Sequence, residues 1–80
     1  MNLKPIVTEK AVMMIESQNV LVFEGDKKVT KEEIKKEIED LFKVKVEKVR
    51  TMLRKNKKHT YVKLKKEFPA IDIATKLGII

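Results

Sequence analysis

Apolar residues recur with a helical period in the stretch PIVTEKAVMMIESQN, residues 5–19. Thr8 is suited to cap a helix, and Glu9 suits the positive end of the helix dipole. The apolar stripe that follows is made by Ala11, Val12, Met14 and Ile15. We therefore expect a short extended piece and then a helix, which ends or turns at Asn19.

The next stretch, VLVFE at residues 20–24, is β-branched and apolar on both parities. A run of this kind favours a strand that is covered on both faces, as central strands are. The turn GDKK is expected to follow, with Gly25 and Asp26 as strand breakers.

The stretch VTKEEIKKEIEDLFK carries the clearest helix signal in the chain. Thr30 and Glu33 have the spacing of a capping box, and Val29 and Ile34 have that of a hydrophobic staple. The predicted buried stripe consists of Ile34, Ile38, Leu41 and Phe42.

Two strands are predicted next, in VKVEKVRTML and TYVKLK, and they should pair as a hairpin through the loop RKNKKH, residues 54–59. The alternation slips at Glu47 and Lys48, which indicates a β-bulge or bend. The face of the hairpin away from the core should carry Arg50, Met52, Arg54, Tyr61, Lys63 and Lys65.

A final short helix is predicted in FPAIDIATKLG, where Pro69 suits the first turn and Gly78 ends the helix. Its inner face should be Ile73, Ala74 and Leu77. The chain thus reads as one domain, residues 1–80, in the order β-α-β-α-β-β-α. The predicted fold is an α/β (α+β) sandwich with a small, mainly antiparallel sheet of three to four strands and helices packed on it.

The composition narrows the function classes. Cysteine is absent, which excludes disulfides, thiolate metal sites and a cysteine nucleophile. No stretch has the apolar length of a signal peptide or a membrane span, so we expect a cytoplasmic protein.

Charge is distributed unevenly. Residues 44–66 contain ten basic side chains and one acidic one, net +9, whereas the other residues contain nine basic and eleven acidic ones, net −2. Such a concentration is typical of a phosphate-binding surface. The alternative is a solvated edge strand whose lysines deter aggregation. Tyr61 could stack on a base or sugar, or it could form the margin of the core.

Catalytic signals are weak. His59, the only histidine, lies among lysines with no neighbouring carboxylate in the sequence. The helical carboxylates, such as Glu32 and Glu39, read as surface partners of lysines four residues away. Gly25 and Gly78 cannot build a phosphate-cradling loop, and Ser17 has no evident triad partners. We expect no enzyme activity, cofactor, metal or small-molecule substrate.

Several segments together resemble a known family. PIVTEKA, VTKEEIKKEIEDLFKVKVEKVRT, the basic turn, YVKL and IATKLGII occur in the order found in the twenty-third protein of the large ribosomal subunit, in its archaeal form. The resemblance covers nearly the whole chain. It implies a structural protein that binds large-subunit rRNA beside the polypeptide exit tunnel and contacts neighbours such as the twenty-ninth protein of that subunit.

The resemblance also implies a platform for factors that meet the nascent chain, including the signal recognition particle. Glu9 matches the factor-docking Glu of the family's Ser/Thr-Glu-Lys-Ala motif, and Lys10 matches its Lys. The basic hairpin corresponds to the rRNA-facing strands. The residues expected to bind rRNA are Lys10, Lys48, Arg50, Thr51, Arg54, Lys55, Lys57, Lys58, His59, Tyr61, Lys63 and Lys65.

Two departures from the family pattern stand out. Bacterial relatives carry a long hairpin loop that enters the tunnel wall, whereas the predicted loop of six residues here spans at most about 20 Å. Arg50 stands where the family often has Asn before Thr. Two other functions stay open, a free regulatory RNA-binding module and an adaptor whose basic face meets an acidic protein.

Overall fold

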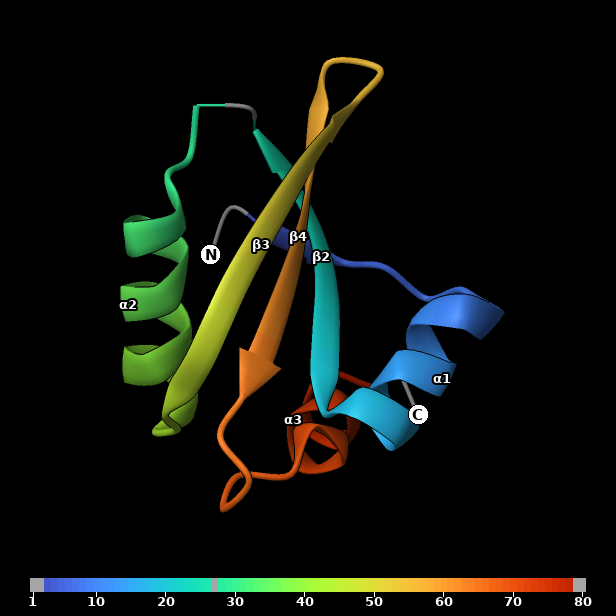
Figure 1. Ribbon diagram of the computed structural model, residues 1–80, viewed down its shortest axis with the longest axis vertical. Helices are drawn as coiled ribbons and strands as arrows, with labels where there is room; N and C mark the ends of the chain where they lie inside the picture. Colours follow the sequence, from blue (N-terminus) through green and yellow to red (C-terminus); the bar gives the residue numbers. More distant parts are fainter. Residues whose placement is uncertain (1–2, 27, 79–80) are drawn as a thin grey trace.

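The computed structural model describes residues 3–26 and 28–78, in which a four-stranded antiparallel sheet packs against three helices (Figure 1). Lys27 of the predicted turn and residues 79–80 of the tail lie outside the described residues. The elements in chain order are β1 (Leu3–Pro5), α1 (Glu9–Gln18), β2 (Val20–Asp26), α2 (Lys31–Phe42), β3 (Val46–Arg54), β4 (Lys57–Leu64) and α3 (Ala70–Lys76). The strand order is β1-β2-β4-β3, with β3 at one edge. The predicted α+β fold and element order are confirmed.

The central strand β2 separates two apolar clusters. Leu21 and Phe23 belong to the main core, together with residues of β4, α2 and α3. Val20 and Val22 point to the opposite side, where they pack with Ala11 of α1. On this second side α1 covers only the part along β2, and β3 and β4 carry exposed side chains. We call this side of the sheet the open face.

The predicted caps of the first two helices are confirmed. The Thr8 hydroxyl accepts a hydrogen bond from the Ala11 N–H at 3.1 Å, and the Thr30 hydroxyl accepts one from the Glu33 N–H at 3.2 Å. Asn19 ends α1 in the left-handed conformation, with φ of 58°. Both helix starts were therefore encoded within four residues of sequence.

The prediction that Leu41 is buried was wrong, since its side chain is 55% exposed. Ile34 and Ile38 are buried and Phe42 packs partly against the core, so the contact row of α2 follows steps of four residues. Leu41 lies about 60° from the middle of that row at 100° per residue. The sheet therefore meets the four-residue row, and Leu41 faces outward.

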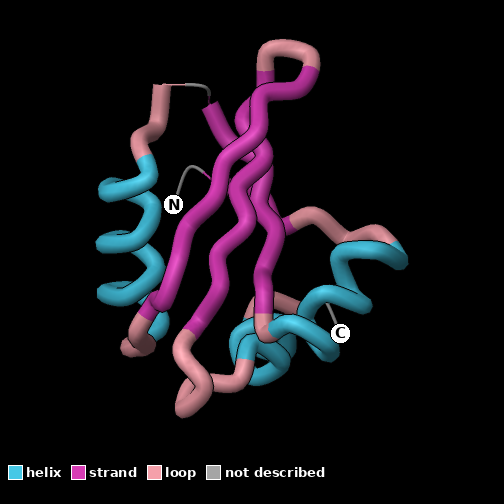
Figure 2. The backbone as a smooth tube through the Cα atoms, in the orientation of Figure 1, coloured by secondary structure: helices cyan, strands magenta, loops and turns pink. Residues whose placement is uncertain are grey.

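The hairpin is longer and tighter than the sequence suggested. The predicted loop of six residues was wrong: β3 runs to Arg54 and β4 begins at Lys57, which leaves the two-residue turn Lys55–Asn56 (Figure 2). Both turn residues have positive φ, 48° and 65°, as type I′ turns require. The bulge predicted near Glu47 is confirmed by the register shift between Val46 and Lys48.

Three other boundaries differ from the predictions. Gly25 and Asp26 continue β2 instead of breaking it, because they pair with Lys58 and Lys57 of β4. The strand predicted from residue 44 begins at Val46. Lys65 was expected on the strand but follows β4, which ends at Leu64.

Candidate nucleic-acid interface

Five cations of the hairpin share the open face. Opposed residues of antiparallel strands project to the same side of a sheet, so the pairing register fixes which side chains meet. Lys63 lies opposite Val20 and Lys48, Tyr61 lies opposite Val22 and Arg50, and Lys57 lies opposite Asp26 and Arg54. We call the set Lys10, Lys48, Arg50, Arg54, Lys57 and Lys63 the basic face. All six side chains are exposed.

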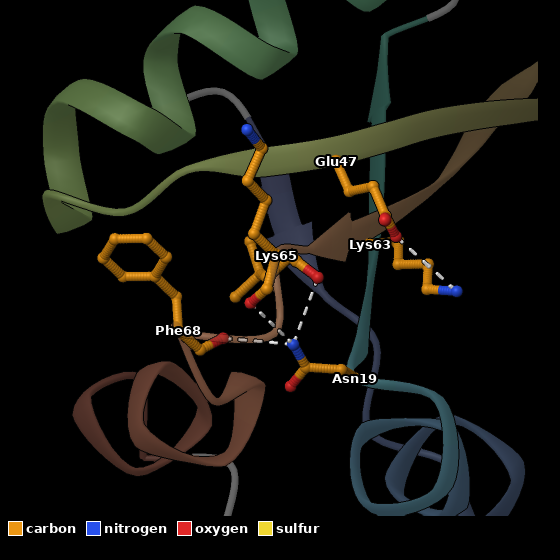
Figure 3. Close-up of polar contacts among 6 residues, drawn as sticks. Asn19, Glu47, Lys63, Lys65 and Phe68 are labelled. Atoms are coloured by element: carbon orange, nitrogen blue, oxygen red, sulfur yellow. Dashed lines mark hydrogen bonds and ion pairs between the residues drawn. The ribbon is translucent and has the colours of Figure 1, made fainter.

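Acidic side chains moderate this charge through exposed ion pairs. Glu24 Oε1 lies 3.3 Å from Lys57 Nζ. Glu47 Oε2 lies 3.6 Å from Lys63 Nζ, as Figure 3 shows. The two lysine side chains are 61% and 50% exposed, so each pair contributes about 0–1 kcal/mol. Such weak pairs leave both lysines available to phosphate.

The sequence predicted His59 in the hairpin loop, and this was wrong: His59 lies in β4. Its Nε2 is 3.9 Å from Glu24 Oε2, so it has a carboxylate neighbour that the sequence did not reveal. The two residues are directly opposed in the β2–β4 register, although 35 positions separate them in the chain. His59 therefore belongs to the open face, beside the basic face.

A hollow of about 420 Å³ lies between α1 and the strands of the open face. Lys10, Met14 and Gln18 of α1 form one wall. The floor and the other wall are formed by Val20, Lys48, Arg50, Thr51, Met52, Tyr61 and Lys63. A second hollow of about 140 Å³ shares Lys10, Met14 and Tyr61 with the first and reaches Arg54 and His59.

Tyr61 stands at the junction of the two hollows. Its ring packs against the cluster of Ala11, Val20 and Val22, and the residue is half-buried. The position at the margin of the core, one of the two alternatives for this residue, is thus observed. Its remaining surface lines both hollows, which keeps base stacking open as a prediction.

Four residues predicted to bind rRNA lie away from the basic face. Lys58 has the opposite parity, and its Nζ donates a hydrogen bond to the Val29 carbonyl at 2.6 Å. Thr51 pairs with buried Thr60, although it also borders the larger hollow. Lys55 occupies the hairpin turn, and Lys65 lies beyond β4.

The helical wall includes two residues that sequence reasoning did not assign to the site, Met14 and Gln18. Both follow Lys10 at intervals of four, which places the three side chains on one face of α1. That spacing was a usable signal. Met14, however, also fits the apolar stripe of the helix, and its residue type alone does not separate the two positions.

Glu9, the predicted docking residue, lies in the first turn of α1 and is exposed. It does not line either hollow. Among residues 3–26 and 28–78, no cluster of three or more His, Cys, Asp or Glu side chains could hold a metal ion. The helices found in those ranges are all too short or too polar to cross a bilayer.

The fold and the basic face together define a small α+β domain that presents cations on one side of its sheet. The family described as "Ribosomal protein L23" matches residues 1–73. The large ribosomal subunit protein uL23 of the archaeon Picrophilus torridus is 46% identical over 77 residues, which cover 96% of this chain and 94% of that protein. The chain therefore belongs to the ribosomal protein L23 family, whose members are structural constituents of the large ribosomal subunit.

Proposed function

We propose that the chain binds large-subunit rRNA through the basic face, as a single domain at the rim of the polypeptide exit tunnel. The observation that carries this proposal is the common side of Lys48, Arg50, Arg54, Lys57 and Lys63, which the strand register fixes. Folded rRNA brings phosphates close together, and its charge requires neutralisation. A rigid sheet fixes the backbone positions of the cations, so binding has to order only their side chains.

The thermodynamic driving force is the release of counterions. Each phosphate neutralised by Lys or Arg frees condensed cations, so the observed binding constant falls steeply as salt rises. Lys57 and Lys63 form weak ion pairs with Glu24 and Glu47 in the free chain. On binding, each lysine exchanges this carboxylate for a phosphate at little cost.

The test compares a variant that lacks four cations of the basic face with a control variant that lacks four cations elsewhere. The first variant carries Arg50→Gln, Arg54→Gln, Lys57→Gln and Lys63→Gln. The control carries four Gln substitutions at exposed lysines of α2 and α3, namely Lys31, Lys35, Lys36 and Lys76. Both variants lose the same charge, so a difference between them reports position.

Filter binding to large-subunit rRNA at several salt concentrations is the measurement. The slope of log K against log salt should become shallower by about 3 in the first variant, at roughly 0.7–0.9 per lost phosphate contact. The control should keep most of the wild-type slope. Equal slopes for the two variants would place the rRNA contact elsewhere.

We also propose contacts with other components at the exit-tunnel rim. Glu9 is proposed to receive factors such as the signal recognition particle, and it is exposed at the start of α1, outside both hollows. The twenty-ninth protein of the subunit is a proposed contact of the chain. The hairpin turn has only two residues, so the hairpin is proposed not to extend far into the tunnel. Crosslinking in intact ribosomes, with mapping of the attached nucleotides and proteins, checks these placements. Crosslinks from Glu9 to rRNA alone would contradict its docking role.

A further inference from the structure

The larger hollow contains more than charge. Phosphate binding requires only cations, yet the ring of Tyr61 and the thioether side chains of Met14 and Met52 lie among the cations of this hollow. Its volume of about 420 Å³ falls within the roughly 300–1,000 Å³ of sites that enclose small organic groups. The hollow therefore suits a ligand that carries both a negative charge and a flat apolar face.

Tyr61 is held in a fixed position at this site. The residue packs on the cluster of Ala11, Val20 and Val22 and also lines both hollows, so little side-chain entropy remains to be lost when a base stacks on its ring. Arg50 lies directly opposite on β3, within reach of the same space. Unpaired bases stack on aromatic rings such as that of tyrosine and on arginine guanidinium planes.

The path through the site continues past the ring. Lys10 and Tyr61 border both hollows, and the smaller one leads to Arg54 and His59 near the hairpin tip. Cations at both ends, with a ring between them, match the repeating order of phosphate, base and phosphate in a single strand. In an A-form duplex the bases are stacked inside, and side chains cannot reach their faces.

We propose that an unpaired segment of RNA lies in this trough, with one base against Tyr61 and its flanking phosphates between Lys10 and the strand cations. This inference rests on the proposed rRNA-binding function and adds a base-stacking site to it. The occupant is a single-stranded nucleotide segment. An acidic peptide would satisfy the cations but would leave the ring without a partner.

The chain supplies its own reporter for the test, because Tyr61 is the only tyrosine and tryptophan is absent. Tyrosine fluorescence of the full chain is measured during titration with hexauridylate and with an abasic hexamer that carries the same number of phosphates. Hexauridylate should quench the emission saturably, and the abasic hexamer should bind without comparable quenching. Equal quenching by both, or binding of hexauridylate without quenching, would overturn the stacking proposal.

Two variants separate stacking from packing. Tyr61→Phe keeps the ring and should bind labelled hexauridylate within about 2-fold of wild type, whereas Tyr61→Leu should bind about 5- to 100-fold more weakly. Binding is followed by fluorescence anisotropy. Both variants are first compared with wild type by circular dichroism, because Tyr61 also packs against α1. A folded Tyr61→Leu variant with undiminished affinity would contradict the proposal.

Controls distinguish this inference from the wider function. If the wild-type chain did not bind rRNA with a steep salt dependence, the proposed function itself would be contradicted. Retained rRNA binding that is indifferent to Tyr61 would overturn only the stacking site. Competition by polyglutamate as strong as that by an RNA of equal charge would point to an acidic peptide, and it would overturn the proposal as well.

Discussion

Asn19 connects two parts of the chain that are far apart in sequence. Its side-chain amide donates to the carbonyls of Leu64, Lys65 and Phe68 at 3.1–3.3 Å (Figure 3). Its Oδ1 accepts a hydrogen bond from the Ala70 N–H at 2.6 Å. Two amide hydrogens are shared among three acceptors. The same residue ends α1 with a positive φ that Asn adopts more easily than most residues. One side chain therefore fixes the α1–β2 junction against the segment that leads into α3.

We expect Asn19→Gly to lower the free energy of unfolding by about 2–3 kcal/mol, because several hydrogen bonds of about 1 kcal/mol each are lost while the backbone conformation is kept. Thermal unfolding followed by circular dichroism should show a fall of roughly 10–20 °C in Tm. Asn56→Gly is the matched control, since Asn56 also has positive φ and is exposed. A similar loss in both variants would show that backbone conformation, not the side-chain contacts, is responsible.

The sequence revealed the contacts of some side chains and not those of others. Thr8 and Thr30 could be predicted as caps because each partner lies three residues away. The partners of Asn19 lie 45 to 51 positions away, and the carboxylate beside His59 comes from another strand. Contacts of that kind depend on the strand register, which the local pattern does not specify.

The hairpin shows why a loop was predicted where strands continue. Arg54, Lys57 and Lys58 lack the apolar alternation of a half-buried strand, and no Gly or Pro marks the turn. Arg54 and Lys57 nevertheless lie in strands, because the open face leaves their side chains exposed. Lys58 points to the other side, where its Nζ donates to the Val29 carbonyl. The remaining turn signal was Asn56, which occupies the second position of a two-residue turn.

We expect Asn56→Val to destabilise the hairpin by about 1–2 kcal/mol, because a β-branched residue is strained at a φ of 65°. Asn56→Gly should remain within about 0.5 kcal/mol of wild type, since glycine is favoured at that position of type I′ turns. Urea unfolding of the two variants gives the comparison, and neither substitution changes charge. If Val and Gly were tolerated equally, the turn would have to adopt another conformation in solution.

The molecule as a whole is electrically polarised. The covered face of the sheet carries the core with α2 and α3, while the open face carries the cations of β3 and β4. Lys48 and Lys63 are directly opposed, and like charges in that arrangement are destabilising. The isolated chain therefore carries a repulsion that a polyanion relieves. The uneven charge was predictable from residues 44–66, and strand alternation predicted a common face for Arg50, Arg54 and Lys63. The register added Lys48 and Lys57 to that face.

We expect the Tm of the isolated chain to rise by about 2–5 °C between 0.1 M and 1 M NaCl, as the Debye length falls from about 10 to about 3 Å and screens this repulsion. The variant without Arg50, Arg54, Lys57 and Lys63 should respond less. The four-lysine control on α2 and α3 corrects for general salt effects. Identical responses in the three proteins would contradict electrostatic strain on the basic face.

The exposed edge of β3 has a further consequence. Nine residues, Val46–Arg54, end the sheet on that side, and backbone groups at such an edge can pair with another copy of the chain. Lysine and arginine on β3 keep two copies apart by repulsion. The side chains proposed to bind rRNA would thus also keep RNA-free copies of the chain from joining edge to edge. Neutralising these cations should promote aggregation at high protein concentration, even where the fold is intact.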